Sequence, residues 1–569
     1  MRDWIAAAAL FAATAGVVLW QNAHVAVLFD LSYILNTAER IALGQIPYRD
    51  FPLAHAPLTF LIQAAIIRLT GRVFFHHVLY VAVTGGLGTV LAWRIALAML
   101  RGQPPRRAAW PLALLLATPL IFLGVYSIVP SPEYDCDCGF WLLVALWAFE
   151  QLDRRKGAAF AFAAGALACV PMFFKQNMGL PLLLAAVGAV ILRRIVTSPR
   201  DKITHGGGAA FLAGACAGLL AALLALHWTA GLGNYIHWTI EYAGHRRLPA
   251  LSLMLDIYRD ATLAWTLPCV VAALLLLWWK ARSGRRFRWP QIAAFALLAA
   301  PFIFTLASLL IYDDADERGD ALLALWPLLL VLAAVLTLAN LFALPRRTSL
   351  RLFVPLLLLA AIHGTFMSQQ LWGSTYGIWP LLVLLLAELL AFLGPFATRT
   401  NGYRWFTPAL AAIISITLLI CGGFYAASEE RLNYANLPDG PAAHSAFPAL
   451  AGLATPGPYL PEIDELLRYA QDNIPYDDGI VLTPGEEPFY FATGRASKFP
   501  VPFFDPTIDP YSPAEIAALA RSRNIRWLIV KTNVQTKEDP TPDRAELMQL
   551  LMQEFTPAAH LRGYDVYRR

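Results

Sequence analysis

Long apolar blocks separated by short polar loops run through most of the chain, and they constrain its fold more than any other feature. The chain has 569 residues, of which 58% are hydrophobic and 15% are charged. A soluble protein carries about 25% charged residues. Apolar blocks of this length are typical of bilayer-spanning helices. The sequence therefore predicts a polytopic α-helical membrane protein.

About thirteen blocks are long and apolar enough to be predicted as transmembrane helices. They cover residues 4–20, 74–93, 109–129, 139–152, 157–174, 178–192, 208–229, 262–279, 290–311, 321–344, 352–367, 378–396 and 406–427. Two further apolar segments, 31–43 and 58–69, are too short to cross comfortably. In segment 31–43 apolar and polar residues fall on opposite helical faces, and Gly44 is a natural stop. We expect the first to be an interfacial helix and the second an interfacial or re-entrant helix, both on the outer face.

The loops between the predicted spans alternate in charge. One set is basic and contains Arg101, Arg106, Arg154, Lys156, Arg193, Arg200, Lys280, Arg285, Arg346 and Arg399. The opposite set holds Asp30, Asp50, Glu133, Asp135, Asp137, Asp313, Asp314 and Asp320. Basic loops stay in the cytoplasm. The acidic loops and the C-terminal region are therefore expected on the extracytoplasmic side.

The composition changes after about residue 430. We expect a membrane domain over 1–430, with its first outer loop at 22–73, then a Pro- and Gly-rich linker over 431–460. Residues 461–569 show helix and strand patterns in alternation, which predicts a small extracytoplasmic α/β domain of ordinary size. Its helices are expected at 463–473, 513–523 and 543–554, and its strands at 479–482, 526–531 and 564–567.

Carboxylates and one lysine gather on the predicted outer face, from loops far apart in the chain. Asp30 follows the first span, Asp135 and Asp137 precede the fourth, and Lys175 follows the fifth. A carboxylate can deprotonate a hydroxyl acceptor, and a cation can stabilise a phosphate leaving group. The arrangement suits glycosyl transfer from a lipid phosphate. Simpler explanations are that Asp30 caps the following helix and that Lys175 snorkels at a helix end.

The pattern of these residues resembles the motifs of the GT-C superfamily of polyprenyl-phosphate-sugar-dependent glycosyltransferases. The chain is similar to its protein O-mannosyltransferase, aminoarabinose transferase and rhizobial lipopolysaccharide glycosyltransferase branches. Asp30 followed by Tyr33 matches the first-loop aspartate and tyrosine of that family. His55-Ala56-Pro57-Leu58 stands where the family often has a Lys-Pro-Pro-Leu-like element, and Phe174-Lys175-Gln176-Asn177 looks like a motif of one bacterial branch.

The resemblance implies a GT-C fold and an inverting transfer with Asp30 as the base, and Asp135 or Asp137 as the second acidic residue. We take Asp135 as the second catalytic residue and Asp137 as substrate-binding. The other residues implied in substrate binding are Tyr33, Arg49, Asp50, His55, Lys175, Gln176 and Asn177. Asp50 is equally typical of a plain turn before Pro52.

The implied partners are a polyprenyl-phosphate-linked sugar, membrane lipids, and an envelope glycan, lipid or protein as acceptor. No cofactor is firmly predicted. The Asp135-x-Asp137 spacing resembles a metal-binding pair but needs a third ligand, so use of a divalent cation stays open. No basic run has interleaved aromatics, which argues against nucleic acid as a partner. The rival classes are a multi-pass transporter or flippase, which would often show repeated halves, and a non-catalytic envelope-assembly protein.

Overall fold

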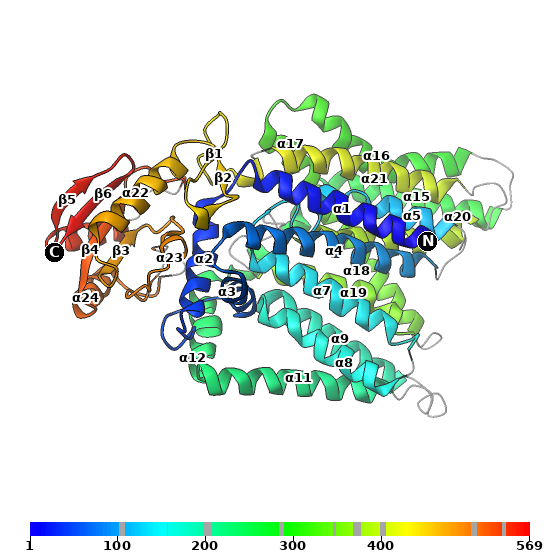
Figure 1. Cartoon of the computed structure of the whole chain (residues 1–569). Coiled ribbons are helices and arrows are strands. Elements are labelled where there is room, and N and C mark those ends of the chain that lie inside the picture. Colours follow the sequence, from blue (N-terminus) through cyan, green and yellow to red (C-terminus); the bar gives the residue numbers. More distant parts are fainter. Residues whose placement is uncertain are drawn as a thin grey trace.

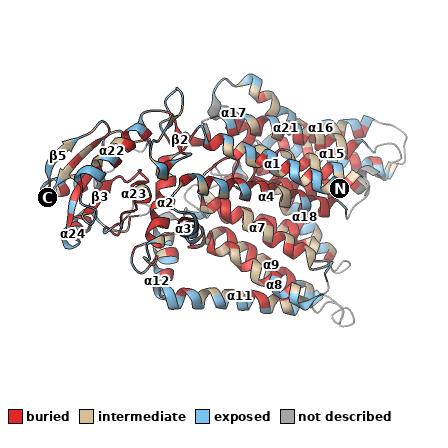
Figure 2. Ribbon diagram, viewed as in Figure 1, coloured by how far each residue is buried: buried red, intermediate tan, exposed pale blue. Residues whose placement is uncertain are grey.

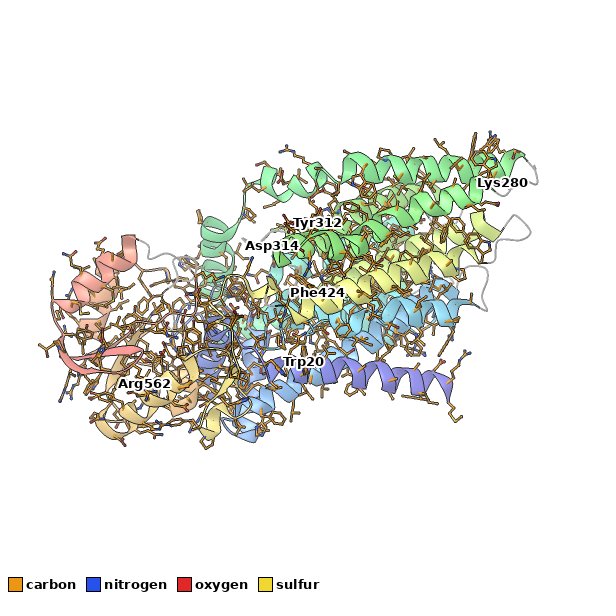
Figure 3. The ribbon with its side chains drawn as sticks, turned by 90° about the horizontal axis from the view of Figure 1, so that it is seen from above. Trp20, Lys280, Tyr312, Asp314, Phe424 and Arg562 are labelled. Carbon is orange, nitrogen blue, oxygen red and sulfur yellow. The ribbon has the colours of Figure 1, made fainter. Side chains whose placement is uncertain are left out.

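A bundle of long helices carries a small α/β domain at one end (Figure 1). The computed structural model describes residues 1–101, 108–155, 157–196, 207–283, 289–344, 349–367, 377–398, 405–428, 430–501, 504, 509–537 and 542–569. The N-terminus lies at the end of the bundle away from that domain. In Figure 3, Lys280, in the last turn of a bundle helix, lies far from Arg562 of the domain, whereas Asp314 of an acidic loop lies toward it. Basic residues 106, 107, 156, 200, 285, 346 and 399 fall outside the described residues.

Within the described chain, eight helical stretches are long and apolar enough to cross a membrane. They are α1 (Arg2–Asn22), α4 (Phe74–Arg101), α9 (Gln176–Val196), α11 (Gly207–Thr229), α15 (Leu263–Ser283), α16 (Trp289–Ile311), the stretch Glu317–Ala343 with α18 (Leu325–Ala343), and α21 (Phe406–Ala427). Shorter or less apolar helices complete the bundle: α7 (Tyr134–Gln151), α8 (Ala158–Cys169), α19 (Val354–Thr365) and α20 (Trp379–Thr398). The structure thus bears out an integral membrane protein but does not reproduce thirteen full-length spans.

The predicted span 109–129 shows one reason for the difference. It forms two short helices, α5 (Ala109–Ala117) and α6 (Leu120–Leu123), which are separated at Thr118 and Pro119. Proline has no backbone N–H and its ring clashes with the preceding turn, so it interrupts a continuous helix. The remainder, 124–133, leads to the start of α7.

The two helices predicted in the first outer loop are present. They are α2 (Leu28–Ala42) and α3 (Leu58–Thr70). Figure 1 shows α2 running crosswise to α1 and α4, at the end that carries the α/β domain. Gly44 follows α2 with φ of 98°, a conformation that favours glycine and ends the helix as the sequence predicts.

The C-terminal α/β domain has a four-stranded sheet in the order β3-β4-β6-β5. Its strands are β3 (Gly479–Thr483), β4 (Ile525–Lys531), β5 (Thr556–His560) and β6 (Tyr564–Arg568), and its main helices are α22 (Tyr459–Asn473), α24 (Pro513–Ser522) and α25 (Pro542–Met552). β3 and β4 are parallel and the other pairs are antiparallel. The six predicted elements are confirmed within a few residues. Strand β5 was not predicted.

Helix α2 and the C-terminal domain share one hydrophobic core. Leu31 and Leu35 of α2 belong to the same buried cluster as Leu460 and Ile529 of the domain. Figure 2 shows α2 as buried along most of its length. Its polar side is covered too, because Asn36 Nδ2 donates a hydrogen bond of 2.8 Å to the carbonyl of Glu487 in the domain. The outer-loop helix is therefore an internal layer between bundle and domain.

A buried ion pair stabilises the part of the C-terminal domain that contacts α2. Lys531 at the end of β4 is fully buried, and its Nζ lies 3.0 Å from Glu486 Oε2 and 3.8 Å from Glu487 Oε1. Glu486 also accepts hydrogen bonds from the backbone N–H groups of Gln535 and Thr536, each at 2.9 Å. Burial alone would raise the pKa of Glu486, but Lys531 and these donors outweigh it and lower the pKa.

We expect Lys531→Met to destabilise the C-terminal domain strongly, because it leaves two buried carboxyl groups without their cation. Removing one partner of a buried pair costs about 3–5 kcal/mol. Arg562→Met is the matched control, since Arg562 pairs with Glu465 at 3.6 Å with 78% of its side chain exposed. The control should change stability by less than about 1 kcal/mol. Thermal unfolding of the detergent-solubilised full chain checks this, and equal shifts for the two variants would contradict it.

Candidate functional site

Asp30 and Tyr33 lie one turn apart on α2, at the end of the bundle covered by the C-terminal domain. The helix begins at Leu28 with Val27 as its N-cap. Asp30 therefore stands inside the first turn, and the explanation that it caps the helix is wrong. A carboxylate in the first turn still interacts favourably with the helix dipole. Asp30 Oδ2 accepts a hydrogen bond of 2.7 Å from Tyr434 Oη.

The loop between α2 and α3 brings His55 against the same helix. Tyr33 Oη and His55 Nδ1 are 2.9 Å apart, and Tyr48 Oη donates to the His55 carbonyl at 2.8 Å. The His55 ring also packs on Tyr134, with 4.2 Å between ring centroids. His55 is 8% exposed. The imidazole is thus held from two sides, by α2 and by the start of α7.

Lys175 and Asp135 form an ion pair next to this group. They come from the turn before α9 and from the first turn of α7, and their side chains are 10% and 8% exposed. Lys175 Nζ also lies 5.4 Å from the centroid of the Tyr134 ring, within range of a cation–π interaction. Tyr134 therefore links the lysine to His55, and the predicted residues Tyr33, His55, Asp135 and Lys175 form one continuous cluster.

Glu133 is a further member of the cluster that was not among the predicted site residues. It is the N-cap of α7, and its carboxylate accepts a hydrogen bond from Tyr134 N. Burial raises the pKa of Glu133 well above its usual range, and the negative charges of Asp135 and Asp30 add to the rise. Asp30 is thus close enough to act electrostatically on the α7 terminus. The sequence signal that could have identified Glu133 is its place in the same acidic loop as Asp135.

Asp137 has a different environment from Asp135. It is fully buried and accepts hydrogen bonds from the hydroxyls of Thr59 (2.7 Å), Tyr80 (2.6 Å) and Tyr126 (2.6 Å). Residues two apart on a helix point to different sides. The two aspartates therefore do not converge, and the described residues contain no group of three His, Cys, Asp or Glu side chains that could hold a metal ion.

The remaining predicted residues make local contacts. Arg49 pairs with Asp50 at 2.9 Å on an exposed turn, and Arg49 lowers the pKa of the Asp50 carboxyl. Gln176 Nε2 donates to the carbonyl of Thr239 at 2.9 Å, and Asn177 Nδ2 donates to that of Gly364 at 3.0 Å. These two amides fix the start of α9, and with it the position of Lys175, against neighbouring helices.

An apolar cavity of about 580 Å³ adjoins the cluster. It lies between α3, α11, the loop 44–48 and the short helix η2 (Val170–Phe173), and its lining includes Leu61, Phe173 and Leu226. Tyr48, which donates to His55, lines it as well. Phe173 precedes Lys175 by two residues. Tyr48 and Phe173 thus connect the cavity to the cluster, whereas Lys175 and the carboxyl groups do not line it.

Comparisons with known proteins give structural neighbours only. No protein-family model matches the chain, and no curated protein sequence matches it. The crystal structure of ArnT from Cupriavidus metallidurans bound to undecaprenyl phosphate aligns at 15% identity and a TM-score of 0.42, covering 98% of this chain and 97% of that one. The oligosaccharyltransferase from Archaeoglobus fulgidus, tethered with an acceptor peptide, aligns at 13% identity and 0.49, covering 98% and 74%.

The arabinofuranosyltransferase AftD from Mycobacteria aligns at 14% identity and a TM-score of 0.40, covering 100% of this chain and 40% of that one. These neighbours are GT-C glycosyltransferases, the superfamily that the sequence motifs resemble. With identities this low and TM-scores below 0.5, the function of this chain is argued from its own site.

We expect Asp137→Asn to lower stability, because an amide has only one acceptor oxygen for three hydroxyl donors and adds an unwanted donor. Hydrogen bonds to a charged group contribute about 1.5–3 kcal/mol, and a loss of this order should appear as a lower melting temperature. Asp472→Asn on the exposed side of α22 is the control, with an expected change below about 0.5 kcal/mol. A melting temperature unchanged by Asp137→Asn would refute this role.

The raised pKa of Glu133 predicts a pH-dependent contribution to stability. The folded protein binds this proton more tightly than the unfolded chain does, so the contribution is complete below the unfolded pKa and is lost as pH rises through the folded one. Glu133→Gln removes the titration. The melting temperature of the variant relative to wild type should therefore rise as the pH increases from about 4.3, the usual pKa of a glutamate, through the neutral range. A difference that stays constant over this range would contradict the assignment.

Proposed function

We propose that the protein transfers a monosaccharide from a polyprenyl-phosphate donor to a hydroxyl group of a cell-envelope glycan, lipid or protein. The observation that carries the proposal is the cluster of Asp30, Glu133, Asp135 and Lys175, largely withdrawn from water beside an apolar cavity. Burying a charged group costs free energy, so buried charges are found where they are paired or functional. A donor with a phosphate and a lipid tail matches both halves of the site.

In the proposed reaction Asp30 is the general base. The acceptor oxygen attacks the anomeric carbon, and Asp30 takes the hydroxyl proton as the new C–O bond forms. The bond from the anomeric carbon to the phosphate oxygen breaks at the same time, and the polyprenyl phosphate leaves with the electron pair. A single displacement of this kind inverts the configuration at the anomeric carbon. Asp135 would orient the sugar or the acceptor.

Lys175 is proposed to neutralise the departing phosphate, with His55 nearby on the Tyr134 ring. Its Nζ is held by Asp135 and by the face of Tyr134, so its position is fixed before the donor binds. Preorganised charge in a site with little water stabilises a developing anion strongly, because no reorganisation is needed at the moment of reaction. Arg49 on its exposed turn is a less direct candidate for the same task.

The apolar cavity between α3 and α11 is proposed to hold the first part of the isoprenoid chain. It has the volume and lining for hydrocarbon, and it ends near the loop that carries His55 and the turn that carries Lys175. The charge pattern of the loops favours an orientation with this end on the extracytoplasmic face. We therefore place the reaction on the periplasmic side of a bacterial plasma membrane.

We expect Asp30→Asn to slow sugar transfer sharply while leaving the protein folded. The assay uses purified full chain, a panel of radiolabelled polyprenyl-phosphate sugars and an envelope extract as acceptor. Loss of a general base lowers the rate by about 10²–10⁴. Asp472→Asn, an exposed position in α22, is the matched control and should retain wild-type transfer. Equal transfer by wild type and Asp30→Asn would remove Asp30 from the mechanism.

A further inference from the structure

We infer that the C-terminal domain positions the carboxylate of Asp30, with Tyr434 as the positioning residue. This inference rests on the proposed function of Asp30 as the base. Tyr434 lies in the connection that follows α21, and its Oη donates to Asp30 Oδ2 at 2.7 Å across 404 residues of sequence. A phenol bound to one carboxylate oxygen fixes the side-chain rotamer, and it thereby sets the direction in which the carboxylate meets an acceptor.

Tyr434 is itself held by the C-terminal domain. Its carbonyl accepts a hydrogen bond of 2.9 Å from Lys537 N, and Asn436 N donates to the carbonyl of Gln535 at 2.6 Å. Ala435 and Thr536 form an antiparallel bridge between these bonds. The backbone around Tyr434 is therefore paired, strand-like, with residues 535–537. The backbone of Tyr434 cannot shift relative to residues 535–537 without breaking this pairing.

The same segment of the domain also holds the start of α2. The first N–H groups of a helix have no partner within the helix. Here Leu28 N donates to Gln535 Oε1 at 2.7 Å, and Gln535 Nε2 donates to the carbonyl of Ala26 at 3.1 Å. Gln535 thus acts as the cap that Val27 cannot supply. Residues 535–537 fix both the helix that carries Asp30 and the phenol that binds it.

This segment is tied to the core of the domain through Glu486. The Glu486 carboxylate accepts hydrogen bonds from the backbone of Gln535 and Thr536 and pairs with the buried Lys531. An unbroken series of contacts therefore leads from the sheet of the domain to the Asp30 carboxylate. The domain is needed at the site for geometry, whichever acceptor the enzyme uses.

The test is the Tyr434→Phe variant, which keeps the ring and removes only the hydroxyl. We expect kcat for sugar transfer to fall about 10- to 100-fold, because the hydroxyl orients the base. KM for the polyprenyl-phosphate sugar should change less than about twofold, because the hydroxyl takes no part in donor binding. Tyr476→Phe is the matched control. Tyr476 Oη donates to the Gly494 carbonyl at 2.6 Å within the same domain, so its loss should leave kcat unchanged and give a similar melting temperature.

Each other outcome overturns the inference. A kcat for Tyr434→Phe equal to that of Tyr476→Phe would show that the hydroxyl does not position the base. A raised KM with unchanged kcat would assign Tyr434 to substrate binding. In the Asp30→Asn background, Tyr434→Phe should cause no further loss, and an additional loss would show that it acts elsewhere. Wild-type protein that transfers none of the tested sugars would instead refute the proposed function, and this inference with it.

Discussion

Each buried or half-buried charge at the end of the bundle that carries the C-terminal domain needs protein groups to replace the water it has lost, and this requirement organises the site. An unpaired carboxylate away from water is so unfavourable that it would take up a proton. Asp137 receives three hydroxyl donors, Asp135 receives the ammonium of Lys175, and Asp30 receives the phenol of Tyr434. The three aspartates are chemically alike, and their environments give them different tasks. Asp137 holds helices together, whereas the other two lie in the charged cluster.

The same requirement explains how α2 is built into the molecule. An interfacial helix would leave its polar side to lipid headgroups or water, but here the domain covers that side. Arg40 on α2 is buried, donates to the carbonyl of Pro500 at 2.9 Å, and stacks 4.4 Å from the centroid of Phe51. Burial lowers its pKa to about 10, so the guanidinium stays charged. The hydrogen bonds that Asn36 and Arg40 make to the domain hold α2, and with it Asp30, in one arrangement between domain and bundle.

Local pattern was sufficient to predict much of the fold. Amphipathic periodicity located α22 and α24, and apolar runs located β3 and β4, because these signals lie within one segment. β5 was not predicted because Thr556-Pro557-Ala558-Ala559 lacks alternation and contains a proline, and it becomes a strand only by pairing with β6. The start of α2 was placed three residues late, since its cap comes from Gln535, 507 residues away. At the site, the role of Tyr434 could not be predicted from the sequence, because its partner Asp30 is 404 residues away. Glu133 could have been found, because it lies in the same acidic loop as Asp135.

The raised pKa of Glu133 limits the negative charge of the cluster. In the proposed reaction, the donor would bring a phosphate to a place where Asp30 and Asp135 already contribute negative charge against one ammonium group. A third ionised carboxyl would repel the phosphate at short range in surroundings that screen charge poorly. Burial and the neighbouring aspartates raise the pKa of Glu133 and so favour its neutral form. The negative charges of Asp30 and Asp135 thus favour the protonated form of Glu133, which keeps a third negative charge away from the place proposed for the phosphate.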